Sequence, residues 1–176
     1  MSTRTAPANG VDLSPVAALV EKISADPAAA DLSFSALTRW TGGVASVTEV
    51  REHEGIAVDE PEALAGADGA PNPVEYALAA LGSCLTVGYV AGATARGIEL
   101  RSLELEIEGT LDLRVFLGLT QGHAGYKRIV VTTTIESDAS AEELEALHTH
   151  VVKTSPVGHT FTNPVELDVK LATRSM

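Results

Sequence analysis

The sequence predicts an α+β fold with a largely antiparallel sheet. Expected strands outnumber expected helices and occur in clusters along the chain. Residues 103–108 alternate strictly between apolar and acidic side chains, which is typical of a strand with one buried and one wet face. Residues 76–95 carry no formal charge and have helical character, so they predict a long helix at the centre of the domain. The length of 176 residues corresponds to one domain.

The N-terminal third predicts a helix followed by a three-stranded meander. We expect residues 1–30 to form a tail and a short helix, and residues 31–171 to form a single domain. Residues 1–10 have the character of a loose tail. Ser14 and Pro15 read as an N-cap and first helical residue, and the helix should end at Asp26-Pro27. Strands are expected at 32–39, 44–50 and 56–58, with a turn at Gly42-Gly43.

The middle of the chain predicts a long loop and then the central helix. Residues 59–73 are rich in Ala, Gly, Asp and Pro, and a loop of this length is either functional or mobile. Pro73 should open a helix that runs to about Arg96, with Gly97 suited to the residue just past its end.

The C-terminal part predicts strands around a second helix. A strand at 103–108 is followed by a candidate strand at 111–117 and by another strand at 127–136. Ser140 and Glu143 fit a capping box at the start of a helix that ends near Lys153. Ser155-Pro156 opens a short helix or turn. Apolar and charged residues alternate over 165–171, which predicts a final strand.

Composition excludes several classes of function. Twelve basic against 24 acidic residues give a net charge of −12, which disfavours binding to nucleic acid or to an anionic membrane. The only cysteine, Cys84, excludes an intrachain disulfide and a multi-thiolate zinc site. No segment near the N-terminus resembles a secretory signal, so we expect a cytoplasmic protein. The stretch 76–95 could span a bilayer by length, but its Gly, Ser and Thr content favours a buried helix.

Two residues are candidates for chemistry. Cys84 is either a small core residue or a reactive thiol, and a reactive thiol requires a cation supplied from elsewhere in the fold. Ser155 is an N-cap, and the alternative of a nucleophile with His159 as its base lacks the turn motif of serine hydrolases. No spacing of histidines suits a metal, and no phosphate or dinucleotide motif occurs, so we expect neither metal nor cofactor.

The segment from Asn72 to Cys84 resembles the helix signature of the OsmC/Ohr family of osmotically induced and organic-hydroperoxide-resistance proteins. In that signature an Asn-Pro pair opens a small-residue helix, and a cysteine follows eleven residues after the proline, as Cys84 follows Pro73. Residues 154–157, Thr-Ser-Pro-Val, resemble the family's Cys-Pro-Val/Ile segment, and Asn163-Pro164 fits its approach to the last strand. The resemblance covers roughly residues 31–171.

The resemblance implies an intertwined homodimer with a sheet wrapped around long central helices. It also implies a thiol peroxidase site at the subunit interface, where a cysteine attacks an organic hydroperoxide and a second cysteine resolves the sulfenic acid. The resemblance further implies that an arginine and a glutamate assist the first thiol. This chain has Ser155 at the position of the second cysteine. The family glutamate falls at Val74, with Glu75 beside it, and the arginine falls near Val44, where Arg39 and Arg51 are the nearest alternatives.

These departures leave three hypotheses for function. The first is a one-cysteine peroxidase that uses Cys84, Glu75 and Arg39 or Arg51, with an external thiol in place of the second cysteine. The second is a non-catalytic protein that binds an apolar small molecule at the dimer interface. The third is a redox sensor that links the Cys84 residues of two subunits.

Overall fold

The computed structural model describes residues 8–174. The predicted loose tail at 1–10 therefore falls mostly outside the described residues. Its last part is not loose, because the Asn9 amide donates to the Thr94 hydroxyl and the Ile98 carbonyl and accepts from the Leu100 N–H. In chain order the elements are η1 (Ala8–Gly10), α1 (Ser14–Ala25), η2 (Pro27–Ala30), β1 (Leu37–Gly42), β2 (Ala45–Glu49), β3 (Ile56–Val58), η3 (Glu62–Leu64), α2 (Pro73–Ala95), β4 (Leu100–Thr110), α3 (Leu113–Phe116), β5 (Arg128–Ser137), α4 (Ala141–Thr154) and α5 (Pro156–Thr162).

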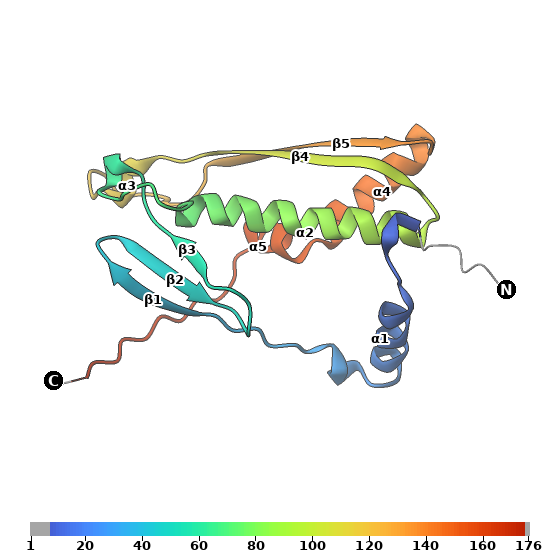
Figure 1. The fold of residues 1–176 in the computed structure, drawn as a ribbon, viewed down its shortest axis with the longest axis horizontal. Coiled ribbons are helices and arrows are strands. Elements are labelled where there is room, and N and C mark those ends of the chain that lie inside the picture. Colours follow the sequence, from blue (N-terminus) through green and yellow to red (C-terminus); the bar gives the residue numbers. More distant parts are fainter. Residues whose placement is uncertain (1–7, 175–176) are drawn as a thin grey trace.

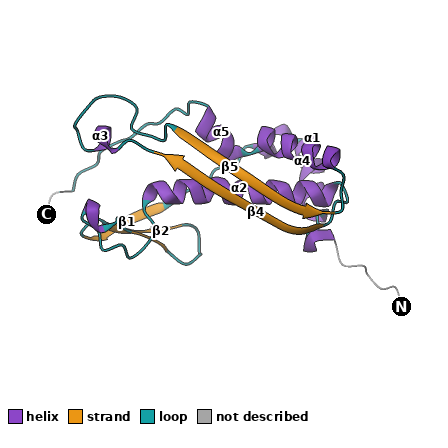
Figure 2. Ribbon diagram, turned by 90° about the horizontal axis from the view of Figure 1, so that it is seen from above, coloured by secondary structure: helices purple, strands orange, loops and turns teal. Residues whose placement is uncertain are grey.

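The predicted α+β class with antiparallel strands and a long central helix is confirmed. β1, β2 and β3 form one antiparallel sheet, and β4 pairs with β5 in a second. Figure 1 shows the β4–β5 ribbon along one side of α2, with the β1–β3 sheet on the other side near the start of the helix. Seen from above, β4 and β5 cross over α2, and α4 and α5 lie on the β5 side (Figure 2).

Helix α2 is defined at both ends by local signals. The Asn72 side chain accepts from the Glu75 N–H, and the Glu75 carboxylate accepts from the Asn72 N–H, so the two residues form a capping box. At the other end Gly97 has a φ of 70°, and the Ile98 N–H bonds back to the Ala93 carbonyl. This left-handed residue ends the helix at the predicted place.

The core forms where α2 meets β4 and α4. Its fully buried large side chains are Tyr89, Leu147 and Val151. Glycines let the neighbouring elements come close to α2: a Cβ at Gly88 would lie 3.0 Å from a Val151 methyl, and one at Gly82 only 2.6 Å from the end of Ile107. The small residues of α2 are therefore contact points for other elements.

The strand alternation follows the predicted faces. Leu103, Leu105 and Ile107 of β4 turn toward the helices, while Glu104 and Glu106 face outward. β5 contributes Ile129 and Val131 to the same inner layer. The predicted capping box of α4 is also present, because the Ser140 hydroxyl accepts from the Glu143 N–H.

Two predictions for the N-terminal part need correction. The N-cap of α1 is Leu13 rather than Ser14, and the carboxylate of Asp12 accepts a hydrogen bond from the Ser14 N–H. The first strand begins at Leu37 and not at residue 32, because residues 32–36 have no hydrogen-bonded neighbour among the described strands.

Two predictions for the later part were also wrong. Segment 111–117 contains the short helix α3 in place of a strand, with the Asp112 side chain as its cap. Residues 165–171 form no strand, and their apolar side chains Leu167 and Val169 are more than 80% exposed. The alternation is present, but a strand requires a neighbouring backbone, and no described strand runs beside this segment.

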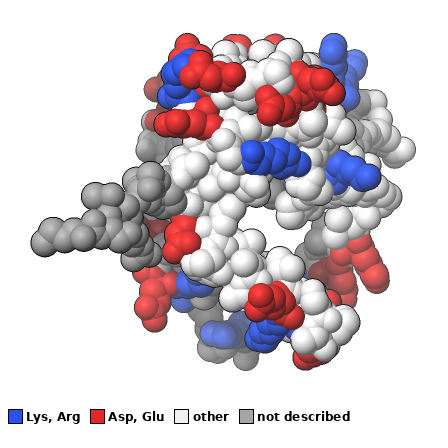
Figure 3. All heavy atoms as spheres, turned by 90° about the vertical axis from the view of Figure 1, so that its right-hand side faces the viewer, with Lys and Arg blue, Asp and Glu red and all other residues white. Residues whose placement is uncertain are grey.

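Charged side chains surround an uncharged hollow in the view of Figure 3. The β1–β3 sheet touches α2 sparsely, for example through the Tyr76 hydroxyl, which donates to the Ala57 carbonyl at 2.7 Å.

By length and composition α2 could cross a membrane, yet only 22% of its most apolar window is buried in this single chain. An apolar helix of this kind is weak grounds for a membrane location, since the core helix of a domain has the same composition.

Candidate functional site

Cys84 lies halfway along α2, where this helix faces the junction of α4 and α5. The thiol is half-buried, and its sulfur is 3.3 Å from the Ser155 hydroxyl oxygen. These residues are 71 positions apart in the sequence, and the resemblance had placed Ser155 at the position of the family's second cysteine. The contact is possible because Gly88, one turn after Cys84, lets Val151 approach the backbone of α2.

Ser155 connects α4 to α5. It is the C-cap of α4 and the N-cap of α5, and only 4% of its surface is exposed. Its oxygen accepts the Gly158 N–H at 3.1 Å. A serine hydroxyl has one hydrogen to donate and two lone pairs, so its hydrogen remains available to the Cys84 sulfur. Pro156 ends α4, because the residue before a proline avoids the helical conformation.

A small cavity of about 320 Å³ opens beside the sulfur. Its walls are mostly aliphatic, and it is lined by Cys84, Val87, Gly88, Val151, Thr154, Ser155 and Pro156. No lysine, arginine, aspartate or glutamate of the described residues belongs to this lining. The site as one chain builds it therefore offers a thiol, a hydroxyl and an apolar surface to a ligand.

The other candidate residues lie elsewhere. Arg39 of β1 forms an ion pair with Glu49 of β2 at 2.5 Å, with both side chains about half exposed. Arg51 has a φ of 53° and contacts His53. Glu75 is committed to the capping box of α2, nine residues before Cys84, which is roughly 14 Å along the helix axis. The structure thus brings Cys84 and Ser155 together but places neither Arg39 nor Glu75 with them within one chain.

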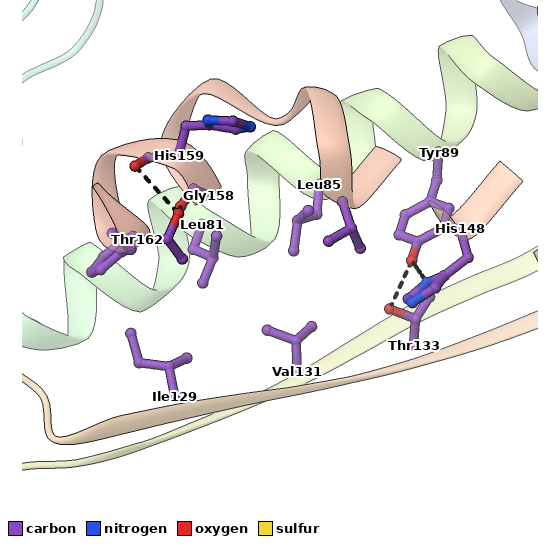
Figure 4. Close-up of a pocket in the computed structure, with 12 residues that line it drawn as sticks. Leu81, Leu85, Tyr89, Ile129, Val131, Thr133, His148, Gly158, His159 and Thr162 are labelled. Atoms are coloured by element: carbon purple, nitrogen blue, oxygen red, sulfur yellow. Dashed lines mark hydrogen bonds between the residues drawn. The ribbon is translucent and has the colours of Figure 1, made fainter. Parts of the chain in front are cut away.

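A second cavity of about 410 Å³ lies between β5, α2 and the α4–α5 segment. It shares no lining residue with the Cys84 cavity. In Figure 4, Ile129 and Val131 of β5 point toward Leu81 and Leu85 of α2.

One end of this cavity carries a polar cluster (Figure 4). The buried Tyr89 hydroxyl lies 2.5 Å from Nδ1 of His148 and 3.3 Å from the Thr133 hydroxyl. The rings of Tyr89 and His148 stack at 6.1 Å between centroids. The Tyr89 hydroxyl therefore links His148 and Thr133 in one hydrogen-bonded cluster.

Sequence reasoning missed the Tyr89 cluster and the capping role of Glu75. The spacing of Leu81, Leu85 and Tyr89 at every fourth residue is a signal for one helix face, but not for a cavity on it. The Asn72–Glu75 spacing is a capping signal that could have been read directly. Among residues 8–174 no three His, Cys, Asp or Glu side chains gather as a metal site.

Comparison with family models gives one match. Residues 66–170 match the model described as OsmC-like protein, which is more than half of the chain. No curated protein matches the sequence significantly.

Solved structures share the fold. An OsmC-like protein from Mycoplasma pneumoniae aligns with a TM-score of 0.66 at 19% identity, over 75% of this chain and 89% of the other. An organic hydroperoxide resistance protein OsmC from Legionella pneumophila aligns with a TM-score of 0.58 at 20% identity, over 75% and 90%. An OsmC-like protein of unknown function from Vibrio cholerae aligns with a TM-score of 0.57 at 16% identity, over 74% and 94%.

Proposed function

Since the chain belongs to the OsmC-like protein family, we propose that it reduces organic hydroperoxides with Cys84 as its nucleophile and an external thiol as reductant. The observation that carries this proposal is the half-buried Cys84 thiol at an apolar cavity, 3.3 Å from a hydroxyl that can donate to it. An organic hydroperoxide has an apolar body and one polar end, which matches such a cavity. The name of the Legionella pneumophila neighbour supports the same substrate class.

The first step oxidises Cys84. Its thiolate attacks the outer oxygen of the hydroperoxide, the O–O bond breaks, and an S–O bond forms. The electron pair of the broken bond leaves with the alkoxide, which takes a proton and becomes an alcohol. The peroxide is reduced by two electrons, and Cys84 becomes a sulfenic acid. The Ser155 hydroxyl faces the sulfur and can donate a hydrogen bond to its anionic form.

The second step needs a thiol from outside the chain, because Cys84 is the only cysteine. An external thiol attacks the sulfenic sulfur, water leaves, and a mixed disulfide forms. A second external thiol then releases Cys84 and leaves as a disulfide. A cytoplasmic location, where small thiols are kept reduced, suits this requirement.

A second copy of the chain completes the site in this proposal. Val87 lines the Cys84 cavity and is 68% exposed, and Trp40 of the β1–β3 sheet is 77% exposed. Exposed apolar surface beside the thiol favours burial by another subunit. A homodimer would also let a cation, for which Arg39 is the first candidate, approach the thiolate from the other copy.

The proposal is tested with cumene hydroperoxide and dithiothreitol. We expect the wild-type protein to consume the peroxide with multiple turnovers, and Cys84→Ala to remove this activity. Ser155→Ala keeps the thiol and is expected to react more slowly, because the sulfur loses its hydroxyl neighbour. Consumption by the wild type that is no faster than with Cys84→Ala would contradict a peroxidase function.

The uncharged lining of the Cys84 cavity favours one other candidate, a non-catalytic protein that binds an apolar molecule there. Native mass spectrometry of the freshly purified protein would detect such a ligand. A redox sensor would instead give a Cys84–Cys84 covalent dimer on a non-reducing gel after peroxide treatment.

A further inference from the structure

Two adjoining cavities lie between β5 and α5, and neither shares a lining residue with the Cys84 cavity. The cavity beside Tyr89 and a neighbouring cavity of about 500 Å³ share Ile129, Phe161 and Thr162 as lining residues. We call their union the β5–α5 groove. Its two parts, of about 410 and 500 Å³, each fall in the size range of small-molecule sites, roughly 300–1,000 Å³.

The inner part of the groove suits an alkyl chain. Leu81, Leu85 and Val131 form its apolar wall. At its end the Tyr89 hydroxyl is already hydrogen-bonded to Thr133 and to Nδ1 of His148, so this hydroxyl demands no polar atom from a ligand. The other histidine of this part, His159, is likewise occupied, since its Nε2 contacts the Lys153 carbonyl at 2.8 Å.

The outer part of the groove is basic in a chain whose net charge is −12. Lys127, Arg128 and His123 line it, and no aspartate or glutamate of residues 8–174 lines either part. Lys127 forms an ion pair with Asp112 at 2.7 Å, whereas Arg128 has no ion pair within 4 Å among the described residues.

Two of the acids near this end, Asp112 and Glu75, are already engaged. Asp112 binds both Lys127 and Arg114, and the Glu75 carboxylate accepts the Asn72 N–H. Tyr126 holds the wall in place, because its hydroxyl donates to the Val74 carbonyl at 2.8 Å.

We propose that the β5–α5 groove binds a single-chain alkyl carboxylate, with the carboxylate at Arg128 and Lys127 and the chain along Phe161 toward Tyr89. The site is separate from the Cys84 cavity, and the proposal does not depend on the peroxidase function. Charge selects the occupant: an anionic head is attracted to the basic end, and a cationic amphiphile of equal length is repelled.

The test uses isothermal titration calorimetry with sodium dodecanoate below its micelle concentration. We expect one site per chain for dodecanoate and no saturable binding of dodecyltrimethylammonium or butanoate. Arg128→Gln should weaken dodecanoate binding roughly two- to fivefold, as for an exposed ion pair. Phe161→Ala should weaken it about tenfold through lost apolar contact.

Two variants serve as matched controls. Arg101→Gln removes an arginine of β4 that pairs with Asp138 and does not line the groove, and it should leave the affinity unchanged. Cys84→Ala should also leave it unchanged, which separates this site from the thiol cavity. Thermal unfolding verifies that each variant is folded.

Three outcomes would overturn the proposal. The first is equal binding of dodecanoate by the wild type, Arg128→Gln and Phe161→Ala. The second is equal binding of the cationic amphiphile, which would indicate a nonspecific apolar surface. The third is no binding at all, as when a second copy of the chain fills the groove.

Sedimentation with phosphatidylglycerol vesicles distinguishes a free anion from a membrane surface, and we expect the protein to stay in the supernatant.

Discussion

At the scale of single residues, Ser155 has two roles at once. Its buried oxygen caps α5 through the Gly158 N–H and lies 3.3 Å from the Cys84 sulfur. A cysteine at this position would bring a second sulfur close to the first, where a disulfide needs about 2.05 Å between sulfurs. The serine keeps the helix cap and excludes a disulfide within the chain.

Ser155→Cys is therefore expected to convert the site into one that resolves its own sulfenic acid. After one equivalent of cumene hydroperoxide, the variant should form a disulfide between Cys84 and the introduced cysteine, detected by intact mass and by non-reducing electrophoresis. The loss of the cap should cost about 0.5–2 kcal/mol of stability.

Thr154→Cys is the matched control for that substitution. Thr154 also lines the cavity, but its hydroxyl donates to the His150 carbonyl one turn back along α4. We expect no disulfide in this variant, and its formation there would indicate that proximity alone, and not the geometry at position 155, decides the reaction.

At the scale of elements, the 59–73 loop is ordered by one carboxylate. Asp59 is 7% exposed, and its Oδ2 accepts the N–H groups of Gly69 at 3.0 Å and Ala67 at 3.1 Å. Gly66 permits the tight path, because a Cβ there would lie 1.6 Å from the Glu60 carbonyl oxygen. The sequence predicted a functional or mobile loop, and the structure shows a loop whose backbone N–H groups bind the buried carboxylate of Asp59.

The hydrogen bond from the Gly69 N–H, with that from Glu60, lowers the pKa of Asp59 below the ordinary value of an aspartate. The folded state therefore binds this proton less readily than the unfolded chain. The stabilisation is complete above the pKa of the unfolded chain and is lost as pH falls through the lower folded value. In urea titrations, Asp59→Asn should unfold at lower urea than the wild type at pH 7, and the difference should shrink below about pH 4.

Asp31→Asn is the control, because the structure assigns no side-chain hydrogen bond to Asp31. Its unfolding midpoint should follow that of the wild type at both pH values. A difference between Asp59→Asn and the wild type that persists unchanged at about pH 3 would show that the charge of this carboxylate does not order the loop.

At the scale of the whole molecule, much apolar surface has no partner among residues 8–174. The alternating residues of 165–171 are exposed, α2 is largely open, and the β1–β3 sheet makes sparse contact with the rest. Apolar surface on this scale is typical of an interface. A second copy would provide both the missing strand neighbour and the cover for α2.

Mixing two inactive variants tests the shared site. If Arg39 acts across the dimer, Cys84→Ala and Arg39→Gln should each lack peroxidase activity. A heterodimer then joins an intact Cys84 in one subunit to an intact Arg39 in the other. After co-expression of the two variants, activity toward cumene hydroperoxide should return in part, with one working site per heterodimer.

Arg101→Gln is the control for the loss of a surface arginine and should remain active alone. No recovery in the mixed sample would mean that Arg39 does not act across the interface. Full activity of Arg39→Gln by itself would show that Arg39 is not part of the catalytic site. The same design would then be applied to Arg51.

Features that depend on near neighbours could be predicted from the chain alone. The limits of α2 follow from Pro73 and Gly97, and the start of α4 from Ser140 and Glu143, since caps and glycines act within a few residues. The inward and outward faces of β4 follow from its alternation. The resemblance placed Ser155 at the position of the family's second cysteine, but no local rule predicts a contact between residues 71 positions apart, and the fold had to show it.

Features that need two distant segments became visible only in the folded chain. Segment 165–171 has a strand pattern but no described backbone to pair with, and 111–117 turns into a helix around the Asp112 cap. The β5–α5 groove is built from Leu81, Val131 and Phe161, which lie on three different elements. Hydrogen bonds between strands and walls of cavities depend on which surfaces meet in space, and the spacing within one segment does not carry that information.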